Sequence, residues 1–424
     1  MMVQSAGAKR IAILHYSAPP LIGGVESTMG DHARLLAARG YSVRLVAGRG
    51  GPAPAGCEMR LVPLAGSRHR RVESVQGELA RGQVTAAFHA LVADLRRELA
   101  AALEGCDVCL AHNMATLNKN LALTTALHDL AAGSGPRLVA WCHDFAWTDP
   151  LYRPALHEGW PWDLLRTAWP GVSYVVVSRD RQGELAGLLG VPAEAISVIT
   201  PGIDPAAFLG LGRRVAGWMD QLGLKGARPL MLLPARVTRR KNIELAVRIT
   251  AALAGRGLSP KLVVMGPLGP HNPANAAYLT ELKALAAELG AAQSVVFLQE
   301  HGHVSDAARR DLYLTADLLL FPSLREGFGI PVLEAGAARL PVFCSDIPPF
   351  RESAGDSAHY FGLDEEPGAI AGRITAFLAG DDASRLRQRV LSEYSWPRIV
   401  ESKIVPLIEG RQPEADQAQG AFGP

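Results

Sequence analysis

Short, continuous apolar runs recur along the chain, and stretches with helical spacing separate most of them. Such runs are typical of buried parallel strands, whose two faces are both covered by helices. The pattern therefore predicts an α/β protein with parallel sheets. The expected strands are residues 10–16, 42–47, 58–64, 107–112, 137–142, 174–178, 196–199, 229–234, 261–265, 295–298, 318–321 and 340–346. The expected helices are residues 25–39, 84–103, 118–132, 178–190, 243–254, 275–288, 305–315, 367–379, 383–394 and 395–409.

At 424 residues the chain exceeds the size of one ordinary hydrophobic core, so we expect two domains. The first strand, helix and second strand follow one another as in a dinucleotide-binding domain. However, no G-x-G-x-x-G motif follows the first strand, which argues against a dinucleotide-dependent oxidoreductase.

The charge balance and the cysteine pattern exclude several classes. A formal net charge of +2 gives no case for nucleic acid as the partner. No segment reaches about 18 uninterrupted apolar residues, and residues 1–10 do not form a signal peptide, so we expect a cytoplasmic protein. Five scattered cysteines indicate reduced thiols. The pair Cys106 and Cys109 lacks the second pair of a zinc or redox site.

One stretch carries the strongest chemical signal. A strand ends at Pro322, and a loop with Gly327 and Gly329 leads into a helix for which Pro331 is the expected first residue. Open α/β sheets bind ligands at this edge, where strands end and helices begin. Glu326 lies in the loop, and Glu334 is expected in the first helical turn, near free N–H groups. Carboxylates suit the hydroxyls of a ribose or hexose, and the N–H groups suit an anion.

The string from Glu326 to Glu334, Glu-Gly-Phe-Gly-Ile-Pro-Val-Leu-Glu, resembles the E-G-F-G-x-P-x-x-E signature of retaining glycosyltransferases of the GT-B fold, glycosyltransferase family 4. The resemblance implies that Glu326 contacts a donor sugar and that Glu334 holds the nucleotide ribose. It places Gly327, Phe328 and Gly329 at the same donor. For either glutamate alone, a surface acid or a helix-dipole carboxylate is the competing interpretation.

Three further elements of the second half match the family. Residues 235–242 resemble its G-R-x-x-x-x-K-G/N element, which implies that Arg236 and Lys241 bind the donor diphosphate. Fixed cations there would stabilise the negative charge that grows on a diphosphate leaving group. Gly266 occupies the place of a family glycine turn near the nucleotide. Residues 200–204 resemble the crossover between the family's two domains.

In the first half, the resemblance implies that Gly23 and Gly24 form a glycine loop near the donor phosphates or the acceptor, although a plain turn would use the same pair. It also implies that His143, at a strand end, contacts the donor sugar, where a structural histidine is the alternative.

Five of the seven tryptophans lie in residues 141–169. Aromatic faces bind sugar C–H faces, so the segment is a candidate acceptor pocket; a local aromatic core is the equally open alternative. The basic cluster at residues 68–71 adds a hypothesis of contact with membrane lipid or a phosphorylated acceptor. The candidate acceptor residues are His112, Asn113, Asp144, Trp147, Tyr152 and Trp160.

The resemblance implies two Rossmann-like domains that face each other across a cleft. Residues 1–204 would form the first, together with a returning helix at 395–410; residues 205–394 would form the second, after a linker that reaches Arg228; and residues 411–424 would be a polar tail.

The implied activity is transfer of a hexosyl group from a nucleotide sugar to an acceptor hydroxyl of a sugar, polyol or lipid-linked precursor. The anomeric configuration would be retained, by a front-face mechanism in which the departing phosphate takes the acceptor proton. No Asp-x-Asp motif is evident, so we expect neither a divalent metal nor another cofactor. A GT-B epimerase, a phosphorylase and a non-catalytic nucleotide-sugar-binding protein remain alternatives. The sequence identifies neither the nucleobase, the sugar nor the oligomeric state.

Overall fold

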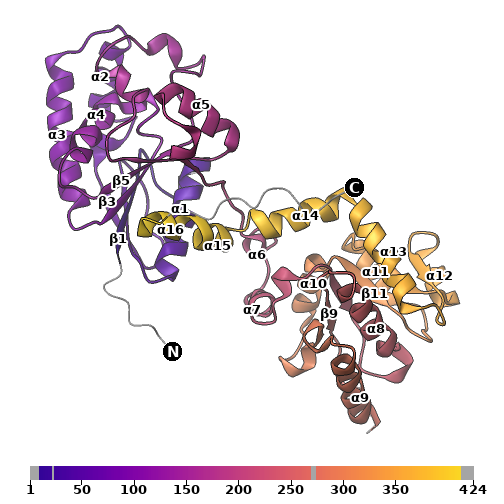
Figure 1. The fold of residues 1–424 in the computed structure, drawn as a ribbon. Helices are drawn as coiled ribbons and strands as arrows, with labels where there is room; N and C mark the ends of the chain where they lie inside the picture. Colours follow the sequence, from indigo (N-terminus) through magenta and orange to yellow (C-terminus); the bar gives the residue numbers. More distant parts are fainter. Residues whose placement is uncertain (1–8, 22, 269–273, 412–424) are drawn as a thin grey trace. The chain divides into compact units, whose positions relative to one another are not determined.

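The computed structural model describes residues 9–21, 23–268 and 274–411. The chain divides into two units. The first extends to Gly202 and resumes at Trp396, and the second comprises Ile203–Ser395. Each unit contains one parallel sheet (Figure 1). Most of the expected polar tail lies outside the described residues.

The first unit has seven strands in the order β3-β2-β1-β4-β5-β6-β7, and every neighbouring pair is parallel. Strand order changes direction between β1 and β4, which are adjacent in the sheet but far apart in the chain. The strands are β1 Arg10–His15, β2 Ser42–Ala47, β3 Cys57–Leu61, β4 Val108–His112, β5 Arg137–Cys142, β6 Ser173–Val176 and β7 Ile196–Val198. The α-helices before the crossover are α1 Gly24–Ala38, α2 Arg70–Leu79, α3 Ala86–Leu103, α4 Leu121–Ala131 and α5 Arg179–Leu189.

Alternate residues of β1 belong to the two cores of this unit. Ala12 and Leu14 pack in one core, and Ile11 and Ile13 in the other. The C-terminal helical segment, which begins at Trp396, contributes to the core of Ile11 and Ile13. The expected return of the last helix to the first domain is therefore confirmed. This segment consists of α15 Trp396–Ile399, a π-helical turn at Val400–Ile404 and α16 Val405–Glu409.

The second unit has six parallel strands in the order β10-β9-β8-β11-β12-β13, with the change of direction between β8 and β11. Its strands are β8 Leu230–Leu233, β9 Lys261–Val264, β10 Val295–Phe297, β11 Leu318–Phe321, β12 Val342–Ser345 and β13 His359–Phe361. Its α-helices are α6 Pro205–Phe208, α7 Arg213–Gln221, α8 Ile243–Ala254, α9 Ala274–Glu288, α10 Asp306–Thr315, α11 Ile330–Ala337, α12 Pro348–Ala354, α13 Pro367–Gly380 and α14 Asp382–Glu393.

One local expectation was wrong. The segment expected as a linker to Arg228 contains α6 and α7, and Trp218 of α7 is buried in the core of the second unit. The basic cluster at residues 68–71 lies at the start of α2: the helix begins at Arg70, and the His69 side chain accepts from Arg71 N–H.

The two parallel-sheet domains and the returning helix confirm the predicted fold class. The cleft between the domains stays a prediction.

Candidate functional site

The carboxyl ends of β8 and β11 lie side by side, and the segments that follow them meet. Lys241 Nζ forms an ion pair with Glu326 Oε1, although the two residues are 85 positions apart. Leu324 N–H donates to Arg240 C=O at 2.9 Å, which ties the two loops together. The structure therefore brings together a predicted phosphate-binding cation and a predicted sugar-binding carboxylate.

This ion pair is poorly solvated. The side chains of Lys241 and Glu326 are 11% and 9% exposed. Burial lowers the pKa of Lys241, and the adjacent Glu326 partly offsets that effect. Lys241 Nζ also lies 4.9 Å from the centroid of the Phe321 ring. A charge pair so far removed from water is held in a defined geometry, because separation of the two charges without a new partner is costly.

Arg236 lies on the segment after β8 and is exposed. Among the described residues it has no ion-pair or hydrogen-bond partner for its side chain. Its charge is therefore available to an incoming anion. Gly266 packs under this segment: a Cβ on Gly266 would lie 2.3 Å from Ala235 O. Gly266 N–H also donates to that oxygen at 3.1 Å, so this residue supports the backbone next to Arg236.

The loop between β11 and α11 combines a strained turn with open space. Gly329 has φ of +101°, and a Cβ there would lie 2.9 Å from the Phe350 ring, so glycine is required. Nothing lies within 4 Å of a Cβ placed on Gly327, and Phe328 is 41% exposed. The backbone on this side of the loop is open to a ligand.

Glu334 does not lie in the first helical turn. Helix α11 begins at Ile330, so Pro331 is its second residue, and no acidic residue lies in its first turn. The Glu334 carboxylate instead accepts from Tyr313 OH at 2.6 Å and pairs with Arg309 at 3.3 Å. The expectation that it faces free N–H groups was wrong, because the helix starts one residue early and Tyr313 and Arg309 of α10 hold the side chain.

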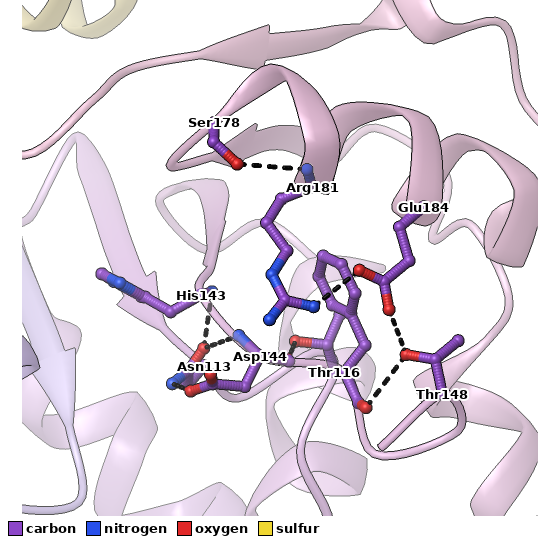
Figure 2. Close-up of polar contacts among 9 residues, drawn as sticks. Asn113, Thr116, His143, Asp144, Thr148, Ser178, Arg181 and Glu184 are labelled. Carbon is purple, nitrogen blue, oxygen red and sulfur yellow. Dashed lines mark hydrogen bonds and ion pairs between the residues drawn. The ribbon is translucent and has the colours of Figure 1, made fainter.

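In the first unit, Asn113 organises the loops that follow β4 and β5. Its φ is +60°, and its Oδ1 accepts from the N–H groups of His143 and Asp144 at 2.7 and 3.1 Å. Its Nδ2 donates to Asp144 Oδ2 at 2.9 Å, and Thr116 Oγ1 donates to Asp144 C=O at 2.8 Å (Figure 2). Asn113 and Asp144 thus fix the backbone conformation at His143.

The next residues of that loop are held by α5. Arg181 lies over the Phe145 ring at 5.4 Å. It also pairs with Glu184 at 2.6 Å (Figure 2). Thr148 Oγ1 donates to Glu184 and lies 3.3 Å from Phe145 C=O. Ser178 Oγ caps the helix by accepting from Arg181 N–H. Sequence reasoning assigned no role to this group, although a serine cap followed by charged residues was visible.

His112 and His143 contact each other directly: His112 Nδ1 lies 3.1 Å from His143 Nε2. His112 is fully buried and stacks on Trp141, whereas His143 is partly exposed. Burial lowers the pKa of both, to about 4 for His143, so both rings are neutral near pH 7. Because His112 has no exposed surface, the prediction that it contacts an acceptor does not fit its position.

The glycine pair lies at the start of α1. Gly24 is the first helical residue, and a Cβ on Gly23 would lie 2.2 Å from Glu26 Oε2. Glu26 folds back to accept from Ser17 Oγ at 2.6 Å and lies 3.9 Å from His15 Nε2. Glu26 has no predicted role from the sequence, although it lies only two residues after Gly24.

The Trp-rich segment is mostly packed. Trp141, Trp147, Trp162 and Trp169 are each at most 8% exposed, whereas Trp160 is 49% exposed and stacks on His89. Arg153 and Arg166 lie over the Trp147 ring, and Tyr152 is half-buried against the core. Of the two interpretations left open, the local aromatic core accounts for four of the five tryptophans.

Within residues 9–21, 23–268 and 274–411, no group of three or more His, Cys, Asp or Glu side chains is arranged to hold a metal ion. Among these residues, no helix has the length and apolar character needed to cross a bilayer. All five cysteines are free.

Two protein families match the chain, one for each unit. Residues 22–207 match the model described as Glycosyltransferase Family 4, and residues 216–393 match that of the glycosyl transferases group 1.

Curated relatives carry glycosyltransferase names. The lipopolysaccharide core biosynthesis mannosyltransferase of Rhizobium meliloti is 30% identical over 234 residues, which are 54% of this chain and 60% of that protein. The mannosylglucosylglycerate synthase of Thermotoga maritima is 26% identical over 80% of this chain and 83% of its own length. The chain thus spans about 60% of the length of the mannosyltransferase that it matches.

Among solved structures, the sucrose-phosphate synthase of Thermosynechococcus elongatus aligns with 95% of this chain and 98% of its own, at 18% identity and a TM-score of 0.38. At that level of likeness, the fold assignment depends on the two sheets themselves.

Proposed function

We propose that this chain, which is of the glycosyltransferase family 4 type, transfers a hexosyl group from a nucleotide sugar to an acceptor hydroxyl with retention of configuration. The match of the first unit to the family 4 model and of the second unit to the group 1 model supports this proposal. One observation carries the proposal: the poorly solvated Lys241–Glu326 pair at the switch point of the second sheet, with Arg236, unpaired within the described part of the chain, on the same segment as Lys241.

The pair explains how the donor would be bound. A diphosphate placed beside Arg236 and Lys241 gives Lys241 a stronger anionic partner than Glu326. Glu326 is then released to accept hydrogen bonds from sugar hydroxyls, while each charge keeps a partner. Glu334, already oriented by Tyr313 and Arg309, offers a second carboxylate for the ribose.

The same cations would serve the chemical step. Negative charge grows on the diphosphate as the glycosidic bond breaks, so fixed positive charges stabilise the transition state more than the ground state. The departing phosphate oxygen would take the proton of the acceptor hydroxyl on the same face, which gives retention without an enzymic nucleophile. Glu326 would orient the sugar. Two protein cations can neutralise the leaving group, so we propose activity without a divalent metal.

The experiment is a screen of nucleotide sugars by thermal shift, followed by product analysis. A mannosyl donor comes first, because the Rhizobium and Thermotoga relatives both have names that refer to mannose. A binder in large excess stabilises the folded protein by about 3 kcal/mol at 100 times its Kd. Two results together support the proposal. Nucleoside diphosphate is released only when an acceptor is present, and NMR shows that the new glycosidic bond has the same anomeric configuration, axial or equatorial, as the donor.

Three results would oppose this function. Conversion of the nucleotide sugar without any acceptor would indicate an epimerase, and binding without turnover over a broad acceptor panel would indicate a binding protein. An inverted product would contradict the retaining mechanism. Loss of activity in EDTA, with recovery on addition of Mg²⁺ or Mn²⁺, would contradict metal independence.

A further inference from the structure

Some ring nitrogens of the buried histidines in the first unit have hydrogen-bond partners, and others have none among the described residues. His112 Nδ1 contacts His143 Nε2 at 3.1 Å, but His112 Nε2 is buried and has no hydrogen-bond partner in the part of the chain that the structure describes. Both nitrogens of His32 and the Nε1 of Trp141 are also buried, and none of them has a partner among the described residues. His32 packs against the rings of His112 and Trp141 at centroid distances of 5.6 and 4.7 Å.

This environment keeps His112 uncharged. Its ring lies against those of Trp141, His32 and His143, and no carboxylate of the described residues pairs with it. A neutral imidazole carries one proton, on either Nδ1 or Nε2. With the proton on Nε2, a buried N–H donor would have no acceptor. With the proton on Nδ1, the unpartnered atom is a bare nitrogen, and the N–H donates to His143.

Unpaired buried N–H groups are rarer and costlier than unpaired acceptors. The proton of His112 therefore belongs on Nδ1, and His143 Nε2 accepts from it. A neutral His143 must then carry its own proton on Nδ1. That nitrogen makes no hydrogen bond with any described residue, and the side chain is partly exposed.

We propose that His112 is a positioning residue that fixes His143 in the Nδ1–H tautomer, so that His143 offers a hydrogen-bond donor, and not a base, to a substrate oxygen. The inference rests on the proposed function, in which His143 contacts the donor sugar. It agrees with a mechanism in which the leaving phosphate, and no side chain, takes the acceptor proton.

The backbone supports the same arrangement. Asn113 Oδ1 accepts from His143 N–H at 2.7 Å, so the residue is fixed at its backbone as well as at its ring. His15 Nδ1 lies 3.0 Å from His112 C=O and links the end of β4 to the end of β1. The ring of His143 is thus oriented by two neighbouring strand ends, those of β4 and β5.

The tautomer can be measured without substrate. Long-range ¹H–¹⁵N correlation spectra of protein labelled at histidine nitrogens distinguish a protonated from a bare ring nitrogen, and loss of one spin system in His143→Gln assigns His143. We expect His143 with a protonated Nδ1 and a bare Nε2. A protonated Nε2 in the wild-type protein would overturn the proposal.

Substitutions at position 112 test the positioning role. Asparagine places an amide N–H where His112 Nδ1 lies, glutamine places it near Nε2, and leucine offers no donor. We expect His112→Leu to lose the single His143 tautomer and to lower kcat about tenfold, as is typical for loss of an orienting partner, with little change in the donor KM. His112→Asn should restore the tautomer and most of kcat, whereas His112→Gln should not.

Leu110→Ala is the control for simple loosening of the strand, because Leu110 is a fully buried apolar residue of the same strand, β4. It should lower Tm and leave the tautomer unchanged. An equal loss of kcat in Leu110→Ala, or no advantage of asparagine over leucine, would overturn the positioning role. If His112→Leu does not fold, the proposal is still tested by the His143 tautomer in the wild-type protein and by the difference between His112→Asn and His112→Gln. If no variant or wild-type protein transfers sugar, the proposed function fails, while the tautomer is tested independently.

Discussion

Both sheets present polar residues at the carboxyl ends of neighbouring strands, but the two edges differ in charge. In the second unit, the edge holds the ion pair of Lys241 and Glu326, and Arg236, which has no side-chain partner among the described residues, lies on the same segment as Lys241. In the first unit, it holds the neutral rings of His112 and His143. Under the proposed function, the charged edge would stabilise a leaving diphosphate, and the uncharged edge would orient sugar oxygens by hydrogen bonds.

The largest expected effect is on the charged edge. Lys241→Ala and Glu326→Ala should each lower kcat about 100-fold, the usual loss for a positioned electrostatic group. Initial rates of nucleoside diphosphate release measure this. The matched control is Arg240→Ala, because Arg240 is exposed, adjacent to Lys241 and not assigned to the site. Near-normal activity of Lys241→Ala would remove the assignment.

Acid should destabilise the first unit selectively. Burial lowers the pKa of His32 to about 3 and that of His143 to about 4, below the ordinary 6.5. Between pH 6.5 and these lower pKa values, the unfolded chain binds more protons than the folded chain. The free energy of unfolding is therefore highest above pH 6.5 and falls as the pH is lowered. Each of these two histidines should lower the free energy of unfolding by about 2 kcal/mol at pH 5, relative to its value above pH 6.5.

Urea unfolding at pH 7.5 and pH 5, followed by tryptophan fluorescence, measures the effect of acid. Trp218 alone of the seven tryptophans lies in the second unit, so the signal reports mainly the first. His32→Phe should weaken the pH dependence. An unfolding midpoint of the first unit that does not change with pH would contradict neutral buried rings.

Each unit has an asparagine with positive φ, and the two differ in the hydrogen bonds of their side chains. Asn113 has φ of +60° and three side-chain hydrogen bonds, whereas Asn242 has φ of +49° and no side-chain cap. Glycine accepts either backbone, so Asn113→Gly should cost about 1–3 kcal/mol from lost buried hydrogen bonds, and Asn242→Gly a few tenths at most. Urea denaturation of both variants checks this, and equal losses would show that the side chain of Asn113 contributes nothing.

The smallest effect concerns Trp160. Its side chain is 49% exposed, so Trp160→Ala should change stability by about 0.5 kcal/mol or less. In contrast, Trp162→Ala should cost about 3–5 kcal/mol because Trp162 is buried. A raised acceptor KM in Trp160→Ala, at unchanged Tm, would give this one tryptophan of the segment a role in binding.

The sequence predicted the strands well, because short continuous apolar runs such as those of β1, β8 and β11 are typical of strands buried on both faces. It predicted the contents of the segment 205–228 poorly. There α7 depends on burial of Trp218 in a core formed by distant strands, and local glycines suggested a linker.

The sequence motifs select the candidate site residues but do not predict the contacts that these residues make. The register of α11 shifted by one residue, and Tyr313 then determined the orientation of Glu334. Likewise, strand-end position suggested that His112 reaches ligand, whereas its burial depends on packing by Trp141 and His32, which no local pattern reveals.

Binding of a nucleoside diphosphate tests the central claim most directly. Calorimetric titration of UDP, GDP and ADP into the wild-type protein should identify one that binds, and Arg236→Ala and Lys241→Ala should each weaken it at least tenfold while Arg240→Ala leaves it unchanged. Equal affinity in all four proteins would contradict the account.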